Sequence, residues 1–393
     1  MNIAFLPSAD LSYESGSIIN ALITIKGLKE LGVTVATLAQ KLPIDINTPI
    51  DNISTNPKLL EHPIITDRYI TDEQHIENLE IYLAYLFTKH VESKIDVVVV
   101  QYFSVASYAA KVFGEVMGVP YIVFSFGRDL SSFDQLSSNL KRMIRESITR
   151  VSGIIFPNEE ILNSFKILRV NKTPPYLISP PALTADIYDL DCSTTQRLPK
   201  DMKVITTINS CFKEEKGIDS IIMAFSSMRK QHNDVILVIA GTDDHPESVN
   251  YKRLKALAKR FEISDSIFFP GYLNRAQIGG LLAGTDLFID ARYVSNFSSV
   301  LIEAQAFKVP TISAKNLSSL QVIEHGANGL LFDANDSYHL AELGLSVLKN
   351  PTLAKVLTNG CTEWCNLHLS TFESNNTIKD IYNFIKGVVK HGS

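Results

Sequence analysis

The 393-residue chain has few cysteines, no excess of basic residues and no long hydrophobic run. Its four cysteines are too few for a disulfide framework in a chain of this length, so we expect reduced thiols and a cytoplasmic location. The formal net charge of -5 argues against nucleic-acid binding, which requires a basic face. No apolar stretch approaches the length of a membrane span, and the apolar run at the N-terminus is too short for a signal peptide.

Clusters of metal ligands are also scarce. Cys361 and Cys365 lie one helical turn apart, but no second Cys/His pair is placed to complete the four ligands of a structural zinc site, which favours packing for both thiols. The segment "GTDDHPES" (241–248) is the nearest approach to a metal-binding carboxylate pair, and its polar composition indicates a solvated loop. The sequence therefore predicts no metal and no resident cofactor.

Short apolar runs alternate with helical patterns along the whole chain, and this order predicts an α/β fold of two doubly wound, Rossmann-like domains. Continuous apolar runs without alternation are typical of parallel strands that are buried on both faces. The expected strands are "NIAFLP", "TVATLA", "DVVVVQY", "YIVFSF" and "GIIFP" in the first half, and "VITTI", "VILVIAG", "SIFFPGY", "LFIDA", "PTISA" and "GLLF" in the second.

The strand–helix order restarts near the middle of the chain. Residues 179–202 are rich in Pro, Asp and Thr, have weak periodicity and are interpreted as a linker. We therefore expect an N-terminal domain over 1–185, a C-terminal domain over 200–365, and a C-terminal helix over 366–393 that returns to the first domain. Ligands of such sheets bind at the carboxyl ends of the strands, so a site in a cleft between two facing domains is expected.

A basic segment, "NLKRMIRESITRVSG" (139–153), carries Lys141, Arg142, Arg145 and Arg150 on an amphipathic pattern. A helix that lies on a membrane surface has this character, and so does the solvated flank of an ordinary helix. Because only four basic residues are present, we favour the solvated helix. A weak contact with a membrane surface stays open as the alternative.

Five motifs follow one another between residues 214 and 333 and carry a family resemblance. They are "EEKGIDSIIMAFSSM", "DVILVIAGTDD", "SDSIFFPGYLNRAQIGGLLAGTDLFIDA", "SNFSSVLIEAQAFKVPTISA" and "VIEHGANGLLFD". In this order and spacing they resemble the donor domain of retaining glycosyltransferase family 4, which implies the two-domain GT-B fold. The first half is similar more weakly, through its strand order and through "DVVVVQYFSVASYAAKVFGEVMGVPYIVFSFGRD".

The resemblance implies that residues around 295–303 bind a nucleotide-sugar donor. Glu303 occupies the second position of the family's Glu-x7-Glu motif, where a carboxylate accepts hydrogen bonds from the nucleotide ribose. Phe297 is retained, whereas Asn296 and Ser298 replace two glycines. Backbone N–H groups from Asn296 to Ser299 open a helix and are expected to bind the sugar diphosphate. The alternative for Glu303 is a carboxylate that only stabilises a helix N-terminus.

The resemblance also implies two phosphate-binding segments. Lys216 stands at the family's phosphate-binding lysine and would neutralise charge on the leaving diphosphate, while Cys211 replaces the arginine that precedes it and Lys213 lies nearby. A solvated lysine in a charged turn is the alternative for Lys216. In "SYESGSIIN", Gly16 and Ser17 resemble a Gly-rich phosphate loop before the first helix, although a plain turn fits the same residues.

The segment "FSFGRDL" and one further residue are predicted to line the acceptor side of the site. Phe126 stands where relatives carry His, Gly127 and Asp129 are retained, and Gln101 occupies a second position where relatives often have His. Arg128 is an added permanent donor that suits a phosphate or an acceptor carboxylate and is predicted to act in catalysis, although it cannot act as a base. The alternative is an exposed turn at Arg128 and Asp129.

Polar residues of typical relatives are replaced at three positions, by Phe126, Cys211 and Ser295. In the mechanism proposed for the family, the leaving phosphate itself helps to deprotonate the acceptor, so these losses do not exclude catalysis. We expect a metal-independent transferase that moves a sugar from a UDP- or GDP-sugar to an acceptor hydroxyl with retention. The acceptor class (small molecule, glycan, lipid or protein) stays open.

Two other functions fit the same resemblance. The three replacements favour a catalytically degenerate pseudo-glycosyltransferase that binds an acceptor or an intact partner glycosyltransferase. A further reading keeps the fold and changes the chemistry to phosphorolysis or epimerisation of a nucleotide sugar.

Overall fold

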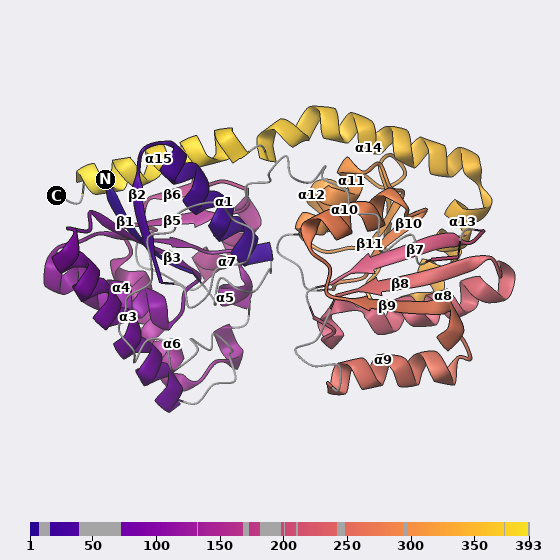
Figure 1. The fold of residues 1–393 in the computed structure, drawn as a ribbon, viewed down its shortest axis with the longest axis horizontal. Coiled ribbons are helices and arrows are strands. Elements are labelled where there is room, and N and C mark those ends of the chain that lie inside the picture. Colours follow the sequence, from indigo (N-terminus) through magenta and orange to yellow (C-terminus); the bar gives the residue numbers. More distant parts are fainter. Residues whose placement is uncertain are drawn as a thin grey trace. The chain divides into compact units, whose positions relative to one another are not determined.

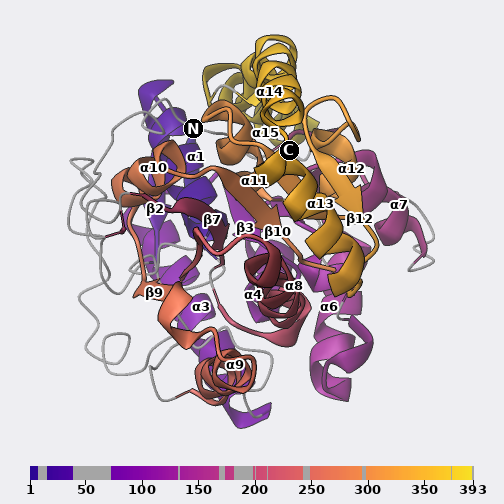
Figure 2. The ribbon, with the colours of Figure 1, turned by 90° about the vertical axis from the view of Figure 1, so that its right-hand side faces the viewer.

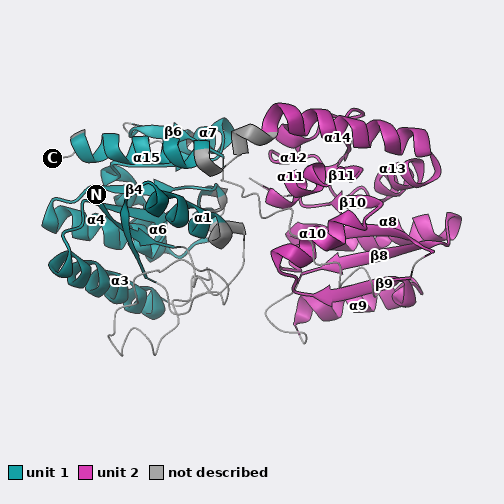
Figure 3. Cartoon of the chain, turned by 45° about the horizontal axis from the view of Figure 1, so that its top comes forward, with its two compact units in different colours: residues 1–184, 371–393 teal, residues 185–370 magenta. Residues whose placement is uncertain are grey.

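A computed structural model describes residues 1–7, 16–38, 72–131, 133–167, 173–180, 198–199, 201–209, 211–241, 248–293, 298–372 and 374–391. The chain divides into two compact units, which Figure 3 distinguishes by colour. Unit 1 comprises residues 1–184 and 371–393, and unit 2 comprises residues 185–370. The division after Thr184 falls inside the segment interpreted as a linker from its composition.

Unit 1 is built on a six-stranded sheet with the order β2-β1-β3-β4-β5-β6, and each of its ladders between described strands is parallel. The strands are β1 (Asn2–Leu6), β2 (Thr34–Thr37), β3 (Val97–Gln101), β4 (Tyr121–Phe124), β5 (Gly153–Phe156) and β6 (Tyr176–Ile178). The helices are α1 (Gly16–Glu30), α3 (Asp72–Glu92), α4 (Val105–Met117), α5 (Arg128–Ser131), α6 (Ser138–Arg150), α7 (Glu159–Ile167) and α15 (Ser374–His391), with a 3-10 turn η1 (Phe133–Gln135).

Successive residues of β1 enter different cores, which explains the continuous apolar runs of this unit. Ala4 and Leu6 pack with side chains of α3, α4, α6 and α7, whereas Ile3 and Phe5 pack with side chains of α1 and α15. Successive side chains of a strand point to opposite faces of the sheet. Because both faces are buried, successive positions of the strand are apolar. The sheet is therefore covered on both faces, as a parallel sheet requires.

Helix α15 contributes to the core of unit 1 although it follows unit 2 in the sequence. Ile378, Ile381 and Ile385 are almost fully buried and belong to the same core as Ile3 and Phe5. A side chain at Gly153 of β5 would meet the ring of Phe384 at 2.9 Å, so α15 lies close against the sheet. The last helix of the chain is thus an integral layer of the first unit.

Unit 2 has a second six-stranded parallel sheet with the order β12-β11-β10-β7-β8-β9. Its strands are β7 (Lys203–Ile208), β8 (Val235–Ala240), β9 (Ile267–Gly271), β10 (Leu287–Asp290), β11 (Thr311–Ala314) and β12 (Leu330–Phe332). Its helices are α8 (Ile218–Gln231), α9 (Val249–Arg260), α10 (Arg275–Ala283), α11 (Ser299–Ala306), α12 (Ser319–Val322), α13 (Ser337–Lys349) and α14 (Pro351–Phe372), with 3-10 turns η4 (Glu214–Lys216) and η5 (Ser264–Ser266).

Helices cover both faces of this sheet as well. Figures 1 and 2 show α8 and α10 on opposite sides of it. Ile205 of β7 packs with side chains of α8, α9 and α13, while Val204 packs in a separate core with Leu281 of α10. The predicted fold class, α/β with two doubly wound parallel sheets, is confirmed.

Candidate functional site

The strand order of unit 2 marks where a ligand is expected. From β7 the chain builds β8 and β9 on one side, and then β10, β11 and β12 on the other, so the order reverses between β7 and β10. In open α/β sheets, ligands bind outside the carboxyl ends of the strands at such a switch point. β7 ends at Ile208 and β10 ends at Asp290, so the loops that follow these two residues form the candidate site.

The loop after β7 is held tightly against the loop after β10. Gly217 has φ +65°, and a Cβ atom there would lie 2.1 Å from the carbonyl oxygen of Ala291, so no other residue fits without displacing the backbone. The N–H of Tyr293 donates to the carbonyl oxygen of Glu215 at 3.3 Å. These contacts place the partly buried Lys216, which ends η4, beside the carboxyl end of β10.

Arg253 of α9 braces the same loop from outside. Its guanidinium donates to both carboxylate oxygens of Asp219, at 3.1 and 3.0 Å, and to the carbonyl oxygen of Phe212 at 3.1 Å. A planar guanidinium suits such a fork, and one side chain therefore fixes both the start of α8 and the loop that carries Cys211 and Lys216. Cys211 is a partly buried free thiol.

A second arginine, which sequence analysis did not identify, organises the loop after β10. Arg292 donates to Asp290 through Nε at 2.7 Å and through Nη2 at 2.6 Å, and it contacts the hydroxyl of Ser298. Ser298 is the N-cap of α11 and accepts from the N–H of Leu301 at 3.3 Å. The cluster thus joins the end of β10 to the start of α11. The sequence did contain a signal for this arginine. Asp290 and Arg292 form a charged pair at the end of the apolar run "LFIDAR", and the ends of parallel strands commonly carry ligand-binding groups.

Glu303 lies on α11 and is 8% exposed. Burial raises the pKa of its carboxyl above the usual range, against the opposing effect of the positive charges of Arg275 and Arg292. Its position in the fifth residue of α11 lies beyond the first helical turn, where the helix dipole acts most strongly. Helix stabilisation alone therefore does not account for a buried carboxylate here.

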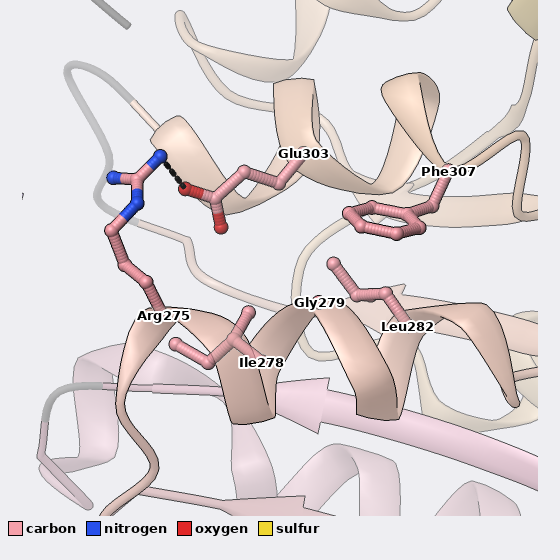
Figure 4. Close-up of a pocket in the computed structure, with 6 residues that line it drawn as sticks. All are labelled: Arg275, Ile278, Gly279, Leu282, Glu303 and Phe307. Carbon is pink, nitrogen blue, oxygen red and sulfur yellow. Dashed lines mark ion pairs between the residues drawn. The ribbon is translucent and has the colours of Figure 1, made fainter. Parts of the chain in front are cut away.

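A small open pocket lies between α10 and α11, beside Glu303. Figure 4 shows the Glu303 carboxylate and the Arg275 guanidinium pointing toward each other at one end, with an ion-pair distance of 4.0 Å between Oε1 and Nη2. The remaining walls are apolar and come from Ile278, Gly279, Leu282 and Phe307. A pocket with one charged end and apolar walls suits a ring that carries hydroxyl groups on one edge.

Of the other residues predicted for donor binding, Ser299 is the first residue of α11 and is partly buried. Gly16 and Ser17 begin α1, but their side chains lie outside the described residues, as do Ser295, Asn296 and Phe297 entirely. The donor roles of these residues stay predictions.

In unit 1, the residues predicted for the acceptor side lie at the carboxyl ends of β3 and β4. Gln101 ends β3 and is buried. Phe126 is partly buried, and its ring lies 5.4 Å from the ring of Tyr102 and 6.3 Å from the ring of Phe124, measured between centroids. Gly127 has φ +89°. The strand order of this sheet reverses between β1 and β3, so Gln101 lies beside a second switch point.

Asp129 ties these loops together. Its carboxylate accepts from the N–H of Phe103 at 2.9 Å, from the hydroxyl of Ser125 at 3.1 Å and from the N–H of Gly127 at 3.1 Å. Burial raises the pKa of Asp129 to about 6, although these hydrogen bonds oppose the shift. Asp129 therefore orients the segment that carries Arg128, whose side chain lies outside the described residues. Contact of either residue with an acceptor stays a prediction.

The basic side chains of α6 are engaged within unit 1. Arg142 and Arg150 lie 3.9 and 3.6 Å from Glu146 and Glu115, and the guanidinium of Arg145 lies over the ring of Phe133. Lys141 donates to a carbonyl oxygen. Among the described residues, none of the helices is long and apolar enough to cross a membrane, and no three His, Cys, Asp or Glu side chains gather in a way that would hold a metal ion.

Comparison with known proteins agrees with this geometry. Residues 193–364 match the family model of glycosyl transferases group 1. N-acetyl-alpha-D-glucosaminyl L-malate synthase from Bacillus anthracis is 27% identical over 151 residues, which are 38% of this chain and 37% of that protein, so the match spans little more than a third of the relative. The segment matched by the family model lies within unit 2.

Solved structures show the same fold over the whole chain. A sucrose-phosphate synthase from Thermosynechococcus elongatus matches with a TM-score of 0.81 and 17% identity, covering 100% of both chains. Anabaena HepE in complex with UDP and glucose matches with a TM-score of 0.76 and 16% identity, covering 98% of this chain and 100% of that one. The chain therefore has the GT-B fold of glycosyltransferases.

Proposed function

We propose that this protein is a glycosyltransferase whose unit 2 binds a nucleotide-sugar donor. The observation that carries the proposal is the buried Glu303, which faces Arg275 across a pocket next to the switch point of the sheet. Burying a carboxylate is costly unless it gains partners, and two ribose hydroxyls supply hydrogen bonds that the folded chain does not. The match of residues 193–364 to glycosyl transferases group 1 and the UDP in the related HepE structure support a nucleotide donor.

The proposed reaction transfers the sugar with retention and without a metal. The bond from the anomeric carbon to the diphosphate breaks, and a bond from that carbon to the acceptor oxygen forms on the same face of the sugar. The acceptor proton passes to an oxygen of the leaving phosphate. We propose that Lys216 and the N-terminal end of α11 stabilise the departing negative charge, and that Arg128 donates to an anionic group on the acceptor side.

Calorimetry with UDP-glucose and GDP-mannose tests this function. Wild type is expected to bind one of the two, and Glu303→Gln to bind it about tenfold to a hundredfold more weakly, because a hydrogen bond to a charged acceptor contributes about 1.5–3 kcal/mol. Glu342→Gln removes an exposed carboxylate on α13 and is the matched control. Absence of binding to both sugars at millimolar concentration would refute the function.

A pseudo-glycosyltransferase is the second candidate, and the aromatic contacts of Phe126 favour it. Where relatives carry a His, this chain has an apolar ring packed against Tyr102 and Phe124. This candidate predicts donor binding without turnover. The two functions separate in a hydrolysis assay, because a glycosyltransferase slowly transfers the donor sugar to water, whereas a pure binding protein leaves the donor intact over days.

A further inference from the structure

Arg275 has a buried hydrogen-bond donor that no described residue satisfies. Its Nη2 atom is inaccessible to solvent and has no hydrogen-bond partner, and the nearest acceptor charge, Oε1 of Glu303, lies 4.0 Å away. Charge-assisted N–H···O bonds have lengths of about 2.7–2.9 Å, so this pair attracts without a hydrogen bond. Leaving a charged donor buried and unsatisfied is costly, and such an exception calls for an explanation.

The position of Arg275 is fixed by the helix on which it lies. Arg275 is the first residue of α10, directly after Asn274, and Asn274 and Gln277 close a reciprocal capping box around this end. The Arg275 side chain is 22% exposed and points into the pocket toward Glu303 (Figure 4). The capping box fixes the backbone of the first turn, from which the Arg275 side chain extends to within 4.0 Å of Glu303.

A hydroxyl group fits the gap between these two side chains. A hydroxyl donates its proton to a carboxylate and accepts from a guanidinium, whereas a second carboxylate, an ammonium or a methyl group satisfies at most one of the two. An oxygen about 2.8 Å from each atom bridges a separation of 4.0 Å without strain in either bond. The apolar walls, Ile278, Leu282 and Phe307, suit the carbon face of the ring that carries the hydroxyl.

We propose that Arg275 is a ribose-reading residue: its Nη2 donates to the same ribose hydroxyl that Glu303 accepts from, so that the pair selects ribonucleotide over deoxyribonucleotide donors. This inference rests on the proposed function and deepens it, because it assigns a second binding side chain and a specificity to the same pocket. A hydroxyl held from both sides discriminates strongly against its absence, since a deoxy ligand leaves two buried charged groups unpaired.

The experiment measures affinities of UDP-glucose and of its 2′-deoxy and 3′-deoxy ribose analogues by calorimetry, with GDP-mannose and its analogues if wild type binds that donor instead. Wild type is expected to bind the ribonucleotide at least tenfold more tightly than one of the two deoxy analogues. Arg275→Gln is expected to weaken binding of the ribonucleotide by about tenfold to a hundredfold. Arg275→Gln should weaken binding of that deoxy analogue much less, so the ratio of the affinities for the ribonucleotide and the deoxy analogue should fall toward one.

Two further variants separate a ribose contact from a structural role. Arg275→Lys keeps the positive charge beside Glu303 but moves the donor, and should recover only part of the discrimination. Arg260→Gln removes an exposed arginine at the end of α9 and should change neither affinity nor discrimination. Unfolding midpoints of all variants show whether each is folded.

Two outcomes overturn this inference by different routes. If wild type binds the ribonucleotide and Arg275→Gln weakens all three ligands equally, or none, the ribose contact is wrong while the proposed function stands. If wild type binds neither UDP-glucose nor GDP-mannose, the proposed function fails and the inference fails with it.

Discussion

The two units have the same architecture but treat the carboxyl ends of their strands differently. In unit 2 the strand ends carry charged groups, with Asp290 and Arg292 in direct contact and Glu303 beside a pocket. In unit 1 the described ends of β3 and β4 carry the packed rings of Tyr102 and Phe126 and the internally hydrogen-bonded carboxylate of Asp129. Among the described residues, unit 2 keeps a buried donor of Arg275 without a partner beside Glu303, whereas the Asp129 carboxylate of unit 1 is hydrogen-bonded by its own loops.

This difference shows that a shared fold does not imply a shared site. Parallel strands fix where a ligand is expected, but side chains decide whether that place offers unsatisfied donors and acceptors. The family match of residues 193–364 covers the unit in which such capacity is seen. Four predictions test the contrast.

The largest effect is expected from a methyl group at the glycine that joins the two loops of unit 2. Gly217→Ala requires an L-residue at φ +65° and places Cβ 2.1 Å from a carbonyl oxygen. We expect a loss of at least about 3 kcal/mol in unfolding free energy, combining strain with displaced backbone. Gly32→Ala in unit 1 is the matched control, because Gly32 has φ +78° and nothing within 4 Å, and it should cost only about 1 kcal/mol. Urea unfolding measures both, and equal losses would contradict the prediction.

The next effect depends on pH and concerns Asp129, whose carboxylate connects the loops after β3 and β4 in unit 1. The pKa of Asp129 in the folded protein, about 6, lies above the ordinary value of 3.8, so folding favours the protonated form. The stability contributed by this group is complete below about pH 4 and is lost as pH rises through about 6. Between pH 4 and pH 7.5 the unfolding free energy of wild type should therefore fall by about 3 kcal/mol relative to that of Asp129→Asn.

Urea unfolding of both chains across this pH range measures that difference. Asp134→Asn, an exposed aspartate in the following turn, serves as the control for removal of a negative charge. If the stability curves of wild type and Asp129→Asn run parallel with pH, the raised pKa of Asp129 is wrong.

A third effect is expected in ligand binding to unit 2. Because the pKa of Glu303 is raised, its carboxylate is lost on acidification earlier than that of an ordinary glutamate. The affinity of wild type for UDP-glucose should fall as pH drops through this pKa, whereas the weaker affinity of Glu303→Gln should not change with pH. The difference in binding free energy between the two proteins, about 1.5–3 kcal/mol at neutral pH, should therefore disappear at low pH. UDP-glucose is the suitable probe because its phosphates lack the second ionisation near pH 6 of a terminal phosphate. If the ratio of the affinities of wild type and Glu303→Gln is the same at all pH values, Glu303 does not accept hydrogen bonds from the ribose.

The smallest effect distinguishes a cap at the site from a cap elsewhere in the same unit. Ser298 and Ser248 are both N-caps that accept from the N–H three residues later, at 3.3 and 3.0 Å. Replacement of either by Ala should cost about 1 kcal/mol of stability. Ser298→Ala also removes a partner of Arg292, so it alone should weaken UDP-glucose binding, by a few-fold. Calorimetry checks this, and equal affinities of the two variants would separate the Arg292 cluster from donor binding.

Much of the fold was predictable because burial on both faces leaves a strong signal. Every strand from β1 to β5 and from β7 to β12 coincides with an expected apolar run. Strand β6 was not predicted. It is a three-residue edge strand, Tyr176–Ile178, whose residues are partly exposed, so it lacks the continuous apolar pattern of the inner strands.

The site was predictable only where a motif fixes the spacing along the chain. The sequence indicated Glu303 and Lys216, but not Arg275 or Arg253, because partners of these two arginines lie up to 41 residues away in sequence. Arg292 was overlooked although its partners Asp290 and Ser298 are local. Ion-pair geometry depends on which helices pack together, and no local pattern encodes it. The pairing of Arg275 with Glu303 follows from α10 lying beside α11 (Figure 4).

The membership of α15 in unit 1 has a consequence for biosynthesis. The first unit cannot complete its core until Ser374–His391 has left the ribosome, whereas the residues of unit 2 are all available earlier. Until then, the face of the N-terminal sheet that carries Ile3 and Val97 has α1 but lacks α15, and this incomplete core exposes apolar surface that favours aggregation. Emergence of Ser374–His391, rather than of the N-terminal half alone, is expected to make the first unit resistant to proteases. Proteolysis of stalled chains of increasing length would show resistance of residues 1–184 appearing only once α15 is exposed.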